Sequence, residues 1–352
     1  MLAKKPSWLG AIHGDLQMHT DWSDGEGSIG AMVEAAIERG YEYIAITDHS
    51  KGLKIAGGID EAQLAQQAQE IDAINDSMAR AGRRLRVLRS LEMNLNPRGE
   101  GDMESAALAK LDIVLGCFHS SLRKKEDQTE RYLAALRNPD IQILGHPRGR
   151  IYNHRLGLSA DWKRVFALAA ELDKAVEIDS YPDRQDLSID LVKLAKQAGC
   201  RISLGTDSHG PSQLRFMEFG AATAMLAGIN ETRILNCMSR EEFLSWAANA
   251  RERTTSNSGQ HVHSALDRSP GQRAYTAKLE EVTNMAFTKN RRAGKTGGNP
   301  GLMPIDDIAN EERVTDMDPD STTGRLASQE EPEARATKRR RSPRKRSSRK
   351  TS

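Results

Sequence analysis

Up to about residue 253, short apolar runs alternate with longer segments in which apolar residues recur every three or four positions. Short bounded runs are typical of buried strands, and the longer spacing is typical of amphipathic helices. The predicted strands cover residues 15–19, 43–47, 86–94, 113–118, 141–145, 175–178 and 201–205. The predicted helices cover residues 29–39, 60–80, 129–137, 161–172, 187–198, 213–226 and 240–250.

This order of elements predicts an α/β fold. Seven strands that alternate with helices indicate parallel strands joined by helical crossovers. Gly40 and Gly199 directly follow two of the predicted helices, at a position where glycine commonly ends a helix. Both an open doubly wound sheet and a closed barrel fit the apolar pattern, so other residues must distinguish them.

The composition changes near residue 253. Ser, Asn, Gly, Thr, Pro and charged residues then dominate, which predicts a largely disordered tail at 253–352, although 275–290 could form a short helix. We therefore expect an N-terminal extension at 1–12 and a folded domain at 13–252. Within the tail, 306–333 is acidic, whereas the segment from Lys338 to Lys350 is basic and should attract polyanions such as DNA or RNA.

Bulk properties exclude some classes of protein. The net charge is only +2, so the whole chain is not a polycation. The three cysteines show no CxxC spacing and are expected to be reduced, small and buried. No stretch approaches the roughly 20 apolar residues of a membrane span, and the N-terminus lacks an apolar signal core. We expect a cytoplasmic protein with no membrane partner.

Metal-ligating residue types follow strand after strand. A histidine stands at or just past the end of five predicted strands, the third strand carries a glutamate, and two aspartates lie close by. These residues are His19, His49, His119, His146, His209, Glu92, Asp24 and Asp207. One such histidine alone would more often be a satisfied core or surface residue. Because parallel strands in a barrel bring their carboxyl ends to one rim, the repeated placement favours a barrel.

Imidazole and carboxylate ligands without cysteine suit Zn, Mn or Fe. This many ligands exceed the needs of one ion, so a cluster of two or three is expected. Ions roughly 3.5–4 Å apart can bind both the attacking and the leaving oxygen of a phosphoryl group, and they generate a metal-bound hydroxide near neutral pH. The sequence therefore predicts a metal-dependent phosphoester hydrolase.

Five segments carry a resemblance to a known family. They are GDLQMHTDWSDG at 14–25, ITDHS at 46–50, HPRGR at 146–150, EIDSYPDRQDL at 177–187 and SLGTDSH at 203–209. Over about residues 13–250 the chain resembles the PHP (polymerase and histidinol phosphatase) family, in the form attached to bacterial family X DNA polymerases. The resemblance implies a distorted (β/α)7 barrel with three metal ions.

The resemblance also implies the ligand sets. One ion should be held by His19, Glu92 and Asp207, and a second by Glu92, His119 and His146, with Glu92 as the bridge. The third should be held by Asp24, His49 and His209. Gln17 departs from the family pattern, because the usual first motif is His-x-His; its amide oxygen would be a weaker ligand. The expected catalytic residues are Glu92, Asp207 and His209.

Other polar residues near these motifs have less certain roles. Four cations are candidates for binding substrate phosphate: Lys51, Arg148, Arg150 and Arg184. Each could equally be a solvated loop residue. Asp48 could orient a metal ligand or cap a turn, and Trp22 could stack on a base, although packing is favoured. His13 and His154 are expected not to ligate.

Three functions remain open at this level. The polymerase-linked resemblance, together with the basic tail, favours 3′–5′ trimming of DNA. The histidinol-phosphatase branch suggests hydrolysis of a small phosphate monoester. A nucleic-acid-associated module without catalysis is the third possibility, supported by Gln17 alone. Because the PHP motifs begin at residue 14, we expect no polymerase activity in this chain.

Overall fold

The computed structural model describes residues 7–266, and the side chains of residues 7–255. The predicted disordered tail, its acidic and basic segments and the possible helix at 275–290 therefore lie almost entirely outside the described residues.

Parallel strands form a closed ring. One sheet has the order β1-β2-β3 and the other has the order β4-β5-β6-β7-β8, with every neighbouring pair parallel. Single parallel bridges join the two sheets on both sides, between His49 and Glu92 and between Met18 and Ser208. The strands are β1 (Gly14–Asp15), β2 (Tyr43–Ile46), β3 (Arg86–Arg89), β4 (Glu92–Asn94), β5 (Leu115–Cys117), β6 (Ile143–Leu144), β7 (Ala175–Asp179) and β8 (Arg201–Gly205).

The predicted α/β barrel is thus confirmed, with one local difference. The single strand expected at 86–94 is divided into β3 and β4. β3 pairs with β2 as far as Arg89, and Glu92 then pairs with His49 and with β5. The regular pairing is interrupted between these two points, which distorts the barrel next to Glu92.

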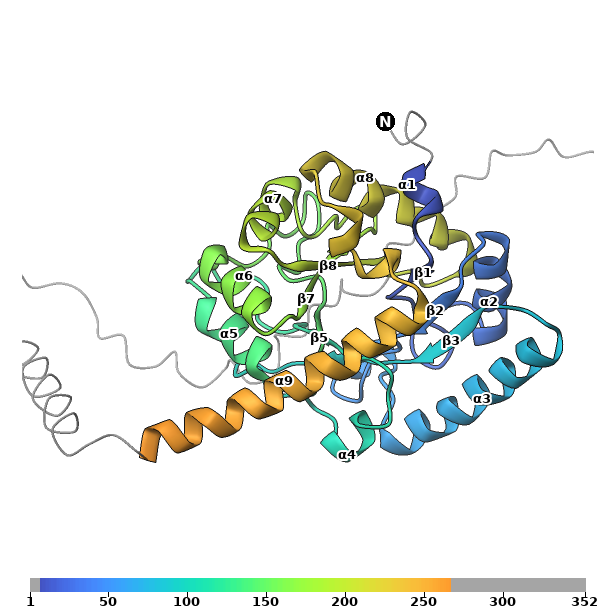
Figure 1. The fold of residues 1–352 in the computed structure, drawn as a ribbon, viewed down its shortest axis with the longest axis horizontal. Coiled ribbons are helices and arrows are strands. Elements are labelled where there is room, and N and C mark those ends of the chain that lie inside the picture. Colours follow the sequence, from blue (N-terminus) through green and yellow to red (C-terminus); the bar gives the residue numbers. More distant parts are fainter. Residues whose placement is uncertain (1–6, 267–352) are drawn as a thin grey trace, which may run out of the picture.

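Helices surround the ring (Figure 1). Side chains cap the starts of two of them: Ser28 caps α2, and Asp60 forms a capping box with Gln63 on α3. The predicted helix at 213–226 is a 3-10 helix, η3 (Pro211–Phe216), followed by α8. The α-helices are α1 (Ser7–Gly10), α2 (Ile29–Glu38), α3 (Glu61–Arg80), α4 (Ser105–Leu108), α5 (Thr129–Arg137), α6 (Trp162–Glu171), α7 (Ile189–Ala198), α8 (Met217–Ala227) and α9 (Arg240–Leu266).

One end of the barrel is closed by α9. Phe243 and Trp246 on this helix are buried in a cluster with Leu16 and Tyr43 from the start of the ring. The rings of Tyr43 and Phe243 stack with centroids 5.4 Å apart, and the Trp246 indole donates to the Asp173 carbonyl. The sequence predicted the end of this helix at residue 250, but α9 continues to Leu266.

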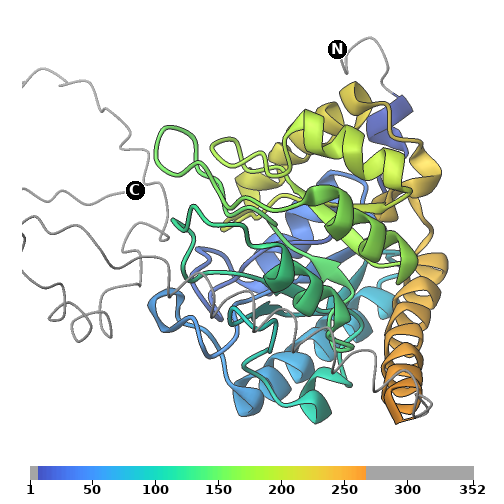
Figure 2. The same cartoon turned by 90° about the vertical axis from the view of Figure 1, so that its left-hand side faces the viewer.

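The long connecting loops lie on the side of the barrel away from α9 (Figure 2). Because the strands are all parallel, this is the side where they end, and it remains available for a site.

Among the described residues, no helix combines the length and the apolar character needed to cross a bilayer.

Candidate metal centre

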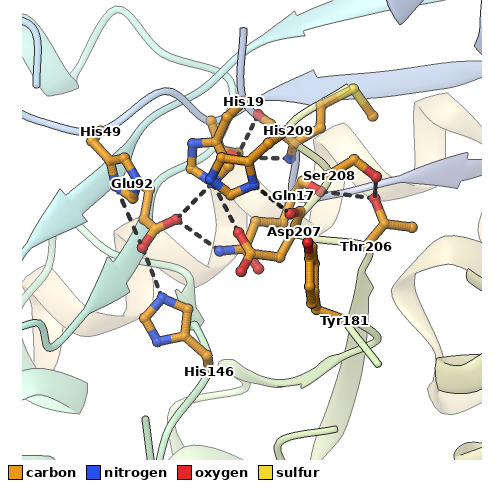
Figure 3. A network of polar contacts seen from close by, with 12 residues as sticks. Gln17, His19, His49, Glu92, His146, Tyr181, Thr206, Asp207, Ser208 and His209 are labelled. Carbon is orange, nitrogen blue, oxygen red and sulfur yellow. Dashed lines mark hydrogen bonds and ion pairs between the residues drawn. The ribbon is translucent and has the colours of Figure 1, made fainter. Parts of the chain in front are cut away.

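The strand-end residues converge at the open end of the barrel. Figure 3 shows the imidazoles of His19, His49, His146 and His209 gathered around the carboxylates of Glu92 and Asp207. The four imidazoles follow four different strands, as the parallel arrangement requires, and Asp207 shares the loop after β8 with His209. The convergence predicted from the sequence is therefore present in the structure.

Glu92 lies at the middle of this group, and its side chain is fully buried. Its Oε1 is 2.7 Å from His119 Nε2 and 2.8 Å from His146 Nε2. Its Oε2 is 3.2 Å from His19 Nε2. One carboxylate thus contacts imidazoles from three separate strand ends, which is the arrangement expected of a bridging ligand.

Two aspartates complete the group. Asp207 Oδ1 lies 3.0 Å from His19 Nε2. Asp24 Oδ1 lies 3.5 Å from Nε2 of both His49 and His209. His19 therefore links the two aspartates: its Nδ1 is 3.9 Å from Asp24 Oδ1, and its Nε2 faces Asp207.

The possible ligand atoms form overlapping clusters, and two of them contain sets implied by the family resemblance. His19, Glu92 and Asp207 form one cluster, and Asp24, His49 and His209 form another together with His19. The remaining set is divided differently, since His119 clusters with His49 and Glu92, whereas His146 clusters with Glu92 and Cys117. Burial raises the pKa of the Cys117 thiol well above its usual value.

Burial and charge act against each other in this site. Burial raises the pKa of Glu92, but the neighbouring imidazoles outweigh it and hold this pKa well below its usual range. Burial lowers the pKa of His146, but the charge of Glu92 outweighs it and raises this pKa to about 9. At His119 burial prevails and lowers the pKa to about 4. Glu92 thus stays ionised and demands positive charge close by.

The same atoms fit divalent metal ions. Nδ1 of His19, His49 and His146 is buried without a hydrogen-bond partner. Buried polar atoms are normally hydrogen-bonded, and a ring nitrogen left free in this way offers a lone pair to a metal. Unpartnered imidazoles beside ionised carboxylates form a donor set suited to Zn or Mn.

Gln17 lies inside the centre but presents its amide nitrogen. Its side chain is fully buried, and Nε2 donates to Glu92 Oε2 over 2.8 Å. Gly205 opposite must lack a side chain, because a Cβ there would lie 2.6 Å from Gln17 Cβ and 2.2 Å from Glu177 Oε1. The amide nitrogen therefore holds Glu92 in place, while Oε1, the atom predicted to be a weak ligand, is buried without a hydrogen-bond partner.

A polar scaffold positions the ligands. Asp48 accepts hydrogen bonds from Thr20 and Ser23, and so it holds the loop that carries Asp24. It caps no helix. His119 Nδ1 is 3.1 Å from Asn94 Oδ1, and Glu177 accepts the backbone N–H of His146. Such outer contacts fix the orientation of ligands.

Of the four predicted phosphate-binding cations, only Arg184 reaches the cavity over the centre. Its Nε is 3.9 Å from Asp207 Oδ2. Arg148 donates to the carbonyls of Leu156 and Leu158, and Arg150 donates to the carbonyls of the loop after β7. Lys51 pairs with Glu61 at 2.7 Å. The two arginines therefore hold loops together, and Lys51 forms an ion pair at the surface.

Arg155 was missed by the sequence analysis. It is buried, lines the same cavity as Arg184 and donates to the Gly149 carbonyl. It stands among polar residues in a long loop, where its local sequence is like that of a solvated arginine.

The remaining residues singled out by sequence have structural roles. Trp22 packs against the core, as favoured from the sequence, and its indole N–H donates to Glu70 on α3. His13 lies 3.3 Å from Glu42, and His154 contacts Arg123 at the loop surface. Neither histidine belongs to a cluster of possible metal ligands among the described residues.

Comparison with known proteins identifies relatives of this chain. The model of the PHP domain family matches residues 15–206. A DNA polymerase/3′-5′ exonuclease from Bacillus subtilis is 39% identical over 236 residues, which cover 66% of this chain and 40% of that protein. A probable phosphatase from Caldicellulosiruptor saccharolyticus is 30% identical over 190 residues, which cover 51% of this chain and 72% of that protein.

Among solved structures, histidinol phosphate phosphatase from Lactococcus lactis, complexed with zinc, L-histidinol and phosphate, matches with a TM-score of 0.45 at 19% identity. The match covers 62% of this chain and 95% of that one.

Proposed function

This chain belongs to the PHP domain family and is a metal-dependent phosphoesterase, and we propose that its substrate is the 3′ end of a DNA strand. One observation carries the hydrolytic part of the proposal: the buried carboxylate of Glu92 contacts imidazoles from three strand ends. The choice of DNA is supported by the 39% identity to a protein described as a 3′-5′ exonuclease.

Three ions, Zn or Mn and alternatively Fe, are proposed for the centre. His19, Glu92 and Asp207 would hold one ion, and Asp24, His49 and His209 would hold another. Glu92, His119 and His146 would hold the third. Bound divalent ions would acidify a water molecule and neutralise charge on the phosphate.

The protein's own residues would orient the phosphate. Burial lowers the pKa of Arg184, but the charges of Asp207 and Asp179 outweigh it and raise this pKa above its usual value, so Arg184 stays charged. It would pair with a non-bridging oxygen of the phosphate. The oxygen of water then bonds to phosphorus, the bond from phosphorus to the 3′ oxygen breaks, and that oxygen takes up a proton. The products are a nucleoside 5′-monophosphate and a strand shorter by one nucleotide.

Hydrolysis of a small phosphate monoester is the second candidate. It is favoured by the relatives described as probable phosphatases, of which the chain covers a large share. The same centre serves both reactions, because both need in-line attack on phosphorus. A module that binds nucleic acid without catalysis would not need the complete set of metal ligands, so the presence of that set argues against this third function.

The experiment compares three substrates with Mn²⁺ or Zn²⁺: a labelled DNA oligonucleotide, histidinol phosphate and an aryl phosphate. We expect stepwise release of nucleotides from the 3′ end. Glu92→Ala should abolish hydrolysis of all three substrates, whereas Glu171→Ala, at an exposed position on α6, should not. Activity confined to the monoesters would transfer the proposal to the second candidate. Purified protein without transition metal would contradict the hydrolytic assignment.

The segment from Lys338 to Lys350 is proposed to hold DNA electrostatically without reading its sequence. A cytoplasmic location is also proposed, because the free cysteines suit a reducing compartment.

A further inference from the structure

A hairpin beside the centre exposes two large apolar side chains. Ile151 and Arg155 pair across it in an antiparallel bridge. Tyr152 is 48% exposed and Leu156 is 89% exposed. Exposed apolar side chains are common on protein surfaces, but here two of them stand on one hairpin at the edge of the cavity, where they offer apolar surface to a ligand.

The hairpin is held firmly at the edge of the cavity. The Tyr152 N–H donates to the Asp183 carbonyl over 2.7 Å, and the Arg150 guanidinium donates to the Arg184 carbonyl over 2.6 Å. On the other side, Arg123 lies 2.9 Å from His154 Nε2. These contacts tie the hairpin to two neighbouring loops. The exposure of Tyr152 is therefore a fixed feature and does not come from a loose loop.

Tyr152 lies on a hairpin that borders the cavity over the centre. Arg155, three residues further along the hairpin, lines the cavity over the centre together with Arg184. The Arg150 guanidinium lies 4.5 Å from the centroid of the Tyr152 ring and so fixes the ring against one cation. Much of the ring is still open to solvent.

The loop after β5, which the hairpin contacts through His154, carries a run of exposed cations. These are Arg123, Lys124 and Lys125, and the exposed acids Glu126 and Asp127 follow them directly. Single-stranded nucleic acids are bound by this combination, in which cations follow the phosphates and an aromatic ring stacks on a base. A small phosphate monoester would need neither feature.

We propose that Tyr152 is a stacking platform for a base near the 3′ end of single-stranded DNA, whose scissile phosphate lies at the metal centre. The proposal rests on the proposed function. Arg150 fixes the ring, and the loop at 123–125 neutralises the backbone of the strand as it leaves the cavity.

The test places the fluorescent base 2-aminopurine in turn at the last three positions of a phosphorothioate oligonucleotide, which resists hydrolysis. Stacking on Tyr152 should quench its fluorescence at one position when the full-length protein binds. Tyr152→Phe should keep the quenching, and Tyr152→Ala should remove it. Phe219→Ala, at an exposed aromatic on α8, is the matched control and should behave as wild type.

A kinetic arm separates this proposal from the proposed function. Tyr152→Ala should raise KM for a natural oligonucleotide about tenfold, because base–aromatic stacking is typically worth that much or more. An oligonucleotide with an abasic residue at the quenched position should raise the KM of the wild type to a similar extent. It should not raise the KM of Tyr152→Ala any further, because the stacking contact is already lost. Turnover of an aryl phosphate should not change.

Three results would overturn the inference. If wild type trims DNA and Tyr152→Ala trims it with the same KM and the same quenching, the platform is absent although the proposed function stands. If wild type hydrolyses aryl phosphate but neither binds nor trims DNA, the DNA substrate and the platform both fail. A change in oligomeric state without a change in DNA binding would assign the hairpin to protein contacts.

Discussion

The replacement of Lys174 by methionine should change how stability depends on pH. The Lys174 side chain is 1% exposed, and its Nζ donates to the Asn138 carbonyl. Burial lowers its pKa to about 7, and the charge of Asp140 opposes this only in part. Between pH 7 and about 10.5, the unfolded chain therefore binds a proton at this lysine that the folded chain does not.

The sign follows from linkage. Where the unfolded state binds more protons, the free energy of unfolding rises with pH. Each pH unit inside this window should stabilise the wild type by about 1.4 kcal/mol relative to a variant without the lysine, and the whole window should amount to about 4 kcal/mol. Near pH 7, Lys174→Met should be the more stable protein by about 2 kcal/mol, since the unpaired Asn138 carbonyl offsets part of the gain.

The measurement is urea unfolding of wild type and Lys174→Met at half-unit steps from pH 7 to 9.5, with equal metal saturation. The advantage of Lys174→Met in free energy of unfolding should shrink as the pH rises, reach zero at about pH 9 and then change sign. Lys193→Met, at a surface position with a 52% exposed side chain, should show no such trend. A difference between wild type and Lys174→Met that stays constant over this range would refute the argument, because Lys174 would then titrate alike in both states.

Three further predictions concern the centre and the tail. Because Gln17 donates to Glu92, Gln17→Leu should weaken zinc binding but leave the number of bound ions unchanged; loss of one ion in elemental analysis would instead make Gln17 a ligand. Arg184→Ala should lower kcat/KM about 100-fold on DNA and on aryl phosphate, whereas Arg164→Ala, on the exposed face of α6, should not; equal rates would exclude Arg184 from phosphate binding. Deletion of 338–352 should raise KM for DNA at low salt only, which a salt titration would check against aryl phosphate turnover.

The convergence of the site was predictable because it depends on a local rule. His19, His49, His119 and His146 each follow a strand, and parallel strands end on one side of a barrel whatever the details of packing. The caps at Ser28 and Asp60 depend on an equally local rule, since their side chains accept hydrogen bonds from residues two or three positions further on.

Contacts between distant segments were not predictable in this way. Arg150 and Arg184 look alike in sequence, but Arg150 donates to carbonyls 34 and 35 residues away, while Arg184 reaches the cavity. The hydrogen bonds by which Asp48 holds the loop of Asp24 join segments that follow two separate strands, and they depend on how those strands pair.

The sequence by itself thus determined the barrel and the set of residues that meet at its open end, because strand order and residue type are properties of the chain. Only the tertiary structure decided how each polar group is used. Gln17 turns its amide nitrogen to Glu92, α9 packs Phe243 and Trp246 into the far end of the barrel, and Arg150 lies against the exposed ring of Tyr152. Each of these depends on which groups from distant segments lie next to one another after folding. The spacing of residues along the chain does not contain that information.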